Sequence, residues 1–127
     1  MNGFHTNIEK DTQENNNFRK VIFTGEHMQL VLMSLLPGEE IGKETHNEID
    51  QFFRFEKGTG TCEMNGKTQK IQAGDVILVP AGTLHNIKNT DEVETMKLYT
   101  IYAAPNHKPG TIHKTKKEAS LNEIHKH

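Results

Sequence analysis

The length, composition and charge of the chain limit the kinds of protein that it can be. Its 127 residues are enough for one domain that buries its own core. Only 33% of the residues are apolar, and no apolar run approaches the roughly 18 residues of a membrane helix, so we expect no membrane partner. The net charge of -2, with Lys and Arg scattered along most of the chain, gives no electrostatic support for binding nucleic acid.

The N-terminal segment, residues 1–17, is polar and rich in asparagine. It lacks the charged start and apolar block of a secretory signal, and we expect it to form a flexible arm ahead of the domain. The single cysteine, Cys62, cannot form an internal disulfide and lies in an expected strand, where a packed thiol is the simplest interpretation. These features predict a cytoplasmic protein.

The segment from Phe18 to Ala104 consists of short apolar stretches separated by turn residues. Period-two alternation and turn dipeptides such as Asn65-Gly66 predict strands rather than helices. We expect an all-β sandwich or barrel over residues 18–104, with strands at 19–24, 28–36, 41–46, 51–55, 61–64, 67–72 and 76–79, a strand that starts at His85, and a last one at 96–102.

Aromatic residues occur on both faces of the expected strand at 51–55. Alternation places Phe53 and Phe55 on one face, towards the barrel interior, and Phe52 and Arg54 on the other. An outward Phe52 needs cover from a second sheet edge, from a second subunit or from the C-terminal tail.

The C-terminal extension, residues 105–127, differs in composition from the barrel. A loop is followed by a Lys-rich end, where Thr115 and Glu118 have the spacing that opens a short helix. His107 and His113 are candidates to approach the mouth of the barrel, as are Tyr99 and Tyr102, but packing or surface roles explain each of them as well.

The residues from Gly74 to Asn89 contain a specific pattern. They read Gly-x5-Pro-x-Gly-x2-His-x3-Asn, in which an apolar strand is followed by a turn and then by His85. This pattern resembles the second conserved motif of the cupin superfamily at every defined position. The resemblance implies a double-stranded β-helix, or jelly-roll barrel, followed here by the short C-terminal helical tail expected above. It also implies a homodimer, because such barrels commonly pair.

The first cupin motif reads Gly-x5-His-x-His, then three or four residues, then Glu-x6-Gly. Gly38, His46 and Gly58 match it, whereas Glu44 replaces the first histidine and Gln51 replaces the glutamate. Gln51 is preferred over its neighbour Asp50 because only Gln51 leaves six residues before Gly58. Asp50 remains the fallback.

The resemblance implies a metal site formed by Glu44, His46, Gln51 and His85. Two imidazoles with a carboxylate and an amide oxygen suit one divalent transition metal, namely manganese, iron, nickel, cobalt or zinc. Some cupins have lost their metal and keep only a ligand pocket. Without an ion, Glu44 could instead be a catalytic acid or base.

Three functions remain open, because the fold does not decide the reaction. The favoured one is a metalloenzyme acting on a small organic molecule, of oxygenase, lyase or isomerase type. The alternative is a non-catalytic module that binds a small molecule or a metal. The third is a sugar-phosphate isomerase, since residues 50–56 and 99–107 resemble small bacterial cupins loosely labelled mannose-6-phosphate isomerase-like. A phosphosugar site would need several cations, and Arg54 is expected to face outward.

Overall fold

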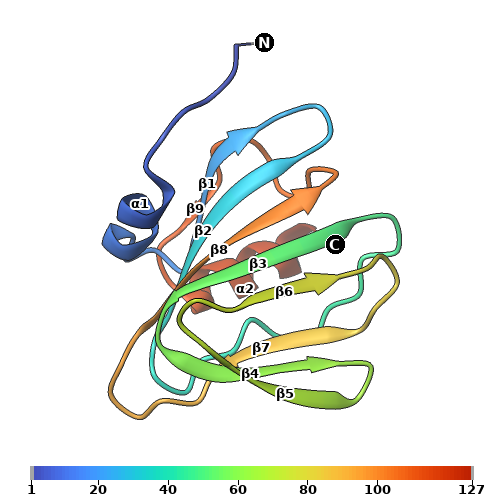
Figure 1. Ribbon diagram of the computed structural model, residues 1–127. Helices are drawn as coiled ribbons and strands as arrows, with labels where there is room; N and C mark the ends of the chain where they lie inside the picture. The colour runs from blue at the N-terminus through green and yellow to red at the C-terminus, as the bar shows by residue number, and fades with distance from the viewer. Residues whose placement is uncertain (1, 127) are drawn as a thin grey trace.

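The computed structural model describes residues 2–126, and the side chains of residues 2–122. The described residues form strands in two sheets and two short helices (Figure 1). In chain order the elements are α1 (Ile8–Glu14), β1 (Arg19–Thr24), β2 (Gln29–Leu35), β3 (Asp50–Lys57), β4 (Thr59–Met64), β5 (Lys67–Gln72), β6 (Val76–Val79), β7 (His85–Asn89), β8 (Met96–Ala103), β9 (Ile112–His113) and α2 (Lys116–Lys126). None of these helices is both long and apolar enough to cross a bilayer.

The strands pair antiparallel in a jelly-roll arrangement. One sheet has the order β6-β3-β8-β2-β1-β9, and the other has the order β5-β4-β7. Figure 1 shows the shorter sheet beside the β3 and β6 edge of the longer one. The expected all-β jelly-roll fold with a C-terminal helix is confirmed.

The core lies between the inner faces of the two sheets. On the longer sheet, Phe53 is opposite Thr100 and Phe55 is opposite Leu98, and all four side chains are buried. Ile87 and other apolar residues of the shorter sheet complete the same cluster. Burying a large apolar side chain contributes about 1.5–3 kcal/mol relative to leaving it exposed. Phe53 and Phe55 therefore face inward as expected.

The segment expected as a strand at residues 41–46 is instead an irregular stretch with one isolated bridge to β7, at Glu44, and a second bridge just before it, at Glu40. Gly42 has a φ of 110°, and its N–H donates to the side chain of Asn86 rather than to a backbone carbonyl. This glycine conformation interrupts regular pairing. The stretch still runs beside β7 and brings Glu44 opposite His85.

The N-terminal segment contains a helix that packs on the domain, where a loose arm was expected. Asn7 caps α1 by accepting from the N–H of Lys10, and Thr12 is fully buried. After the helix, Asn15 is also buried, and its carbonyl accepts a hydrogen bond from the buried ammonium of Lys97. These contacts hold the segment against the outer face of the longer sheet.

The C-terminal extension also joins the fold. Residues of β9 pair with Arg19 and Lys20, so the extension adds an edge strand to the longer sheet. The helix start near Thr115 is confirmed, since its hydroxyl accepts from the N–H of Glu118. In α2, Ala119 is buried in the core cluster. The extension therefore packs on the barrel, and the boundary at residue 105 stays a prediction.

Candidate metal centre

Three side chains of the two sequence motifs come together inside the barrel. The possible ligand atoms of Glu44, His46 and His85 all lie within 4.8 Å of one another. The backbone fixes two of these residues. The N–H of Glu44 donates to the carbonyl of His85 at 2.9 Å, and the N–H of His85 donates back at 3.0 Å. This reciprocal pair aligns the two side chains on one face of the barrel wall.

His46 is held by the turn that precedes β7. Its carbonyl accepts a hydrogen bond from the N–H of Gly82 at 2.8 Å, and its Nε2 lies 2.9 Å from Oε2 of Glu44. Its ring centroid is 5.6 Å from that of His85. The glycine turn of the second motif therefore positions a histidine of the first motif, although 36 positions separate Gly82 from His46 in the sequence.

His85 is oriented as a metal-binding histidine would be. It is 4% exposed, and its Nδ1 lies 2.9 Å from the carbonyl oxygen of Thr83. Since a carbonyl only accepts, Nδ1 carries a proton, and in the neutral form of the ring Nε2 then has the lone pair that a metal would need. Histidine ligands of metal sites commonly use such a second hydrogen bond to fix their tautomer. The ring of Phe53 lies edge-on beside it, at 6.1 Å between centroids.

Gln51 lies on the inner face of β3, opposite Tyr102 of β8. The side chain is 4% exposed, and its Nε2 donates to the hydroxyl of Thr100 at 2.9 Å. Its Oε1 is buried and makes no hydrogen bond of ordinary geometry. A buried oxygen without a donor is uncommon and calls for a partner such as an ion. Asp50, the fallback, is exposed and accepts from the N–H of Ala81 instead.

The carboxyl group of Glu44 is kept in its ionised form. Burial alone raises its pKa, but a hydrogen bond from His46, the charge of His46 and the charges of Arg19 and His85 outweigh burial and hold the pKa below its usual value. An ionised carboxylate is the form that binds a cation. An ionised carboxylate can also accept a proton, so it can act as a catalytic base but not as a catalytic acid.

Tyr102 and His107 lie next to the cluster. The ring of Tyr102 meets that of His46 edge-on at 5.9 Å, and its hydroxyl lies 3.4 Å from Nε2 of His107. Burial raises the pKa of Tyr102 to about 12. The phenol therefore keeps its proton at neutral pH and can donate a hydrogen bond. Tyr99, by contrast, pairs with Arg54 in the sheet register, and its ring lies 6.2 Å from that of the outward Phe52.

Arg19 is a feature of the interior that sequence reasoning did not identify. It is only 2% exposed, and its Nη1 lies 3.3 Å from Nδ1 of His113. Its inward position follows from the same alternation that places Val21 in the core. The adjacent Lys20 is also a cation, so the order of residues in this strand did not show which of the two side chains points into the barrel.

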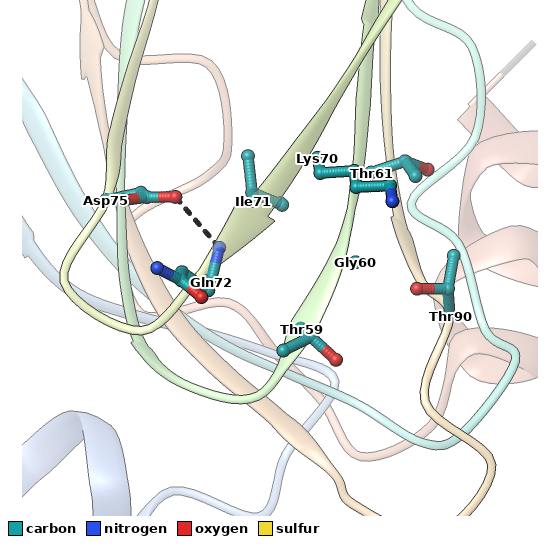
Figure 2. Close-up of a pocket in the computed structure, with 8 residues that line it drawn as sticks. All are labelled: Thr59, Gly60, Thr61, Lys70, Ile71, Gln72, Asp75 and Thr90. Carbon is teal, nitrogen blue, oxygen red and sulfur yellow. Dashed lines mark hydrogen bonds between the residues drawn. The ribbon is translucent and has the colours of Figure 1, made fainter.

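A surface pocket of about 490 Å³ lies away from this cluster (Figure 2). It opens over β4 and β5, and Figure 2 shows the hydrogen bond from the N–H of Gln72 to Asp75 at its side. It is lined by Thr59, Gly60, Thr61, Lys70, Ile71, Gln72, Asp75 and Thr90. Its described lining contains no histidine and one carboxylate. We therefore assign the candidate site to the barrel interior.

Comparison with known proteins agrees with the fold. A family model described as a cupin domain matches residues 31–102. A crystal structure of a Bacillus halodurans protein superposes with a TM-score of 0.91 at 42% sequence identity, covering 94% of this chain and 95% of that one.

Three curated proteins are similar in sequence. The Bacillus subtilis protein YrkC is 46% identical over 123 residues, which are 91% of this chain and 65% of that protein. A protein of Acanthamoeba polyphaga mimivirus is 44% identical over 110 residues, 84% of this chain and 68% of that protein. The chain thus spans about two thirds of the length of these two relatives. A Thermotoga maritima protein named oxalate-binding protein is 34% identical over 62 residues, 49% of this chain and 51% of that protein.

Proposed function

Because the chain belongs to the cupin family, we propose that it binds one divalent transition-metal ion and acts as a metalloenzyme on a small organic molecule. The observation that supports this proposal is the convergence of Glu44, His46 and His85 within 4.8 Å. In the neutral ring of His85, Nε2 is available as a ligand, and the carboxylate of Glu44 is ionised, which are the forms that bind a cation.

The donor set fits such an ion. Two imidazoles and a carboxylate suit manganese, iron, cobalt, nickel and zinc, and no thiolate is among the donors to favour copper(I). Gln51 would be the fourth donor through its buried Oε1. A bound ion of this kind supplies Lewis-acid or oxygen-activating chemistry.

The surrounding residues would prepare the substrate position. Thr83 holds the ring of His85, and Phe53 excludes water from one side of it. Tyr102 keeps a proton that can be donated to a substrate oxygen. Oxygenase, lyase and isomerase reactions all use such a combination of a polarising centre and a nearby donor. In a metal-free protein, Glu44 would be the base of the site.

A second candidate function is that of a non-catalytic binding module. The name of the Thermotoga maritima relative, oxalate-binding protein, favours it, although the alignment covers about half of each chain. The sugar-phosphate isomerase has less support. Arg54, which would bind the phosphate, instead pairs with Glu56 at 2.6 Å.

The decisive test is the metal content of protein purified without a metal column. We expect near-stoichiometric metal in the wild type after incubation with manganese, iron, nickel, cobalt or zinc, and loss of it in the His46→Ala and His85→Ala variants. His27→Ala is the matched control, because His27 is an exposed turn residue whose contact is with Glu26. Wild-type protein that stays metal-free with every ion would contradict the metalloenzyme and favour the binding module.

A further inference from the structure

Arg19 is a buried cation on the inner face of the longer sheet. It begins β1, lies opposite Met33 of β2 and His113 of β9, and is 2% exposed. Met33 belongs to the hydrophobic core cluster. The guanidinium therefore lies inside the barrel rather than in solvent, although arginine is rarely buried unless it is paired.

The partners of this guanidinium do not neutralise it. Nη1 lies 3.3 Å from Nδ1 of His113, which must accept because arginine only donates, and the group sits 5.3 Å from the ring centre of Phe18. Its Nε is buried without a hydrogen-bond partner. Among the described side chains, no carboxylate comes within 4.0 Å of Arg19. A buried charge with unused donors is unfavourable unless an anion joins it.

The guanidinium starts from the same inner face of the longer sheet as Gln51 and Tyr102. Arg19 is opposite Met33, Met33 is opposite Leu98, and Leu98 alternates with Tyr102 along β8. Glu44 is the single anionic donor of the cluster. A divalent ion together with Arg19 would leave this space with excess positive charge even after Glu44 is counted. An anionic ligand would balance that charge.

We propose that Arg19 binds the carboxylate of a small organic acid whose other donor atoms face the metal cluster. The part of this inference that concerns the ion rests on the proposed function, whereas the salt bridge to Arg19 does not need the ion. A carboxylate matches the planar guanidinium fork with two oxygens. A phosphate group would require further cations, and the other buried cation, Lys97, is bound to Asn15 and Ser34 on the outer face.

The test uses the full chain and two dicarboxylates, malonate and succinate, with their neutral diamides as controls. Isothermal titration calorimetry is run with metal-free and with metal-loaded protein. We expect saturable binding of at least one acid and none of the diamides. Arg19→Met should weaken binding by roughly 10- to 100-fold, the usual effect of losing a charge-assisted hydrogen bond. Arg54→Met is the matched control, because Arg54 is the chain's other arginine and pairs with Glu56.

Two further measurements separate this role from a structural one. Without ligand, Arg19→Met should keep the metal content of the wild type, and its thermal midpoint should be unchanged or higher, because a buried unpaired charge is removed. Arg19→Lys should bind the acids more weakly than the wild type, since lysine keeps the positive charge but lacks the planar group that donates two parallel hydrogen bonds to a carboxylate.

The inference is overturned if wild-type protein binds neither acid, if it binds the diamides equally well, or if Arg19→Met binds the acids as tightly as the wild type. Tighter binding of inorganic phosphate than of both acids would overturn the carboxylate assignment. If Arg19→Met does not fold, the binding of acids and diamides to the wild type, together with the weaker binding expected of Arg19→Lys, tests the inference. Absence of metal together with Arg19-dependent binding of the acids would defeat the proposed function but support this inference.

Discussion

At the scale of single residues, Cys62 shows how burial controls chemistry. The thiol is fully buried in β4, and burial raises its pKa to about 11. The reactive thiolate is therefore nearly absent between pH 7 and 9 in the folded protein, and it becomes available only as the pH rises towards 11 or the chain unfolds. We predict no reaction with Ellman's reagent at pH 8 under native conditions and one thiol per chain in guanidinium chloride. Rapid native labelling would contradict the packed position.

Gln51 allows a second prediction at this scale. In Gln51→Glu, a carboxylate replaces the amide whose oxygen now lacks a donor, and the hydroxyl of Thr100, which accepts from Nε2 of Gln51, can rotate to donate to the carboxylate. An anionic ligand binds a divalent ion better than a neutral amide, so the Kd for the metal should fall on the order of tenfold, about 1.4 kcal/mol. Competition with a chelator measures this change. Equal affinity in Gln51→Glu and wild type would argue that residue 51 is not a ligand.

At the scale of elements, one buried lysine holds the N-terminal helix in place. The Nζ of Lys97 donates to the carbonyl of Asn15, the side chain of Asn16 and the hydroxyl of Ser34. Burial lowers the pKa of Lys97, so part of the gain from these hydrogen bonds is offset by the cost of burying the charge.

We predict that Lys97→Met exposes α1 to proteolysis and lowers the free energy of unfolding by about 1–3 kcal/mol, because three oxygens lose a buried donor. Chemical denaturation and limited digestion measure both effects. Lys57→Met is the control, since Lys57 is half-exposed and its ion pair with Glu94 is 4.0 Å long. The same cleavage pattern in both variants would show that Lys97 does not hold the helix.

The sequence predicts those elements whose backbone conformation is set by neighbouring residues. Asn65-Gly66 was predicted as a hairpin turn, and both residues have positive φ, 48° and 84°. The helix α1 was missed because its support comes from Lys97, more than 80 positions away, and not from its own polar sequence. The short strand β9 was missed for the same reason. Its two residues carry no alternation and are defined by pairing with β1.

At the scale of the whole molecule, the spacing of two motifs was enough to predict which histidines meet. His46 and His85 come together with Glu44 because the fold pairs the stretch before β3 with β7. Arg19 could not be identified this way, since no motif surrounds it and the strand that pairs with the start of β1, β9, comes more than 90 positions later. The ligand roles of Glu44, His46, Gln51 and His85 stay predictions, as do the catalytic role of Glu44 and the cytoplasmic location.

The outer face of the longer sheet bears on the expected homodimer. An apolar groove of about 290 Å³ runs over β3, β6 and β8, and it is lined by residues that include Phe52, Leu78 and Ile101. Leu78 is 66% exposed. No residue of the described C-terminal tail is among those that line this groove, and β9 lies at the opposite edge of the sheet from β6. Neither the described tail nor the shorter sheet contributes to the lining of the groove, which favours a second copy of the chain as the cover for Phe52.

We therefore predict that the 14.4 kDa chain has twice its mass in solution and that Leu78→Glu makes it monomeric, because a charge placed in an apolar contact must be desolvated. Val93→Glu is the matched control: Val93 is 84% exposed, apolar and in the loop before β8, so its replacement should leave the mass unchanged. Light scattering coupled to size exclusion measures the mass. A monomeric wild type, or a dimer that survives Leu78→Glu, would mean that the groove is not where two copies meet.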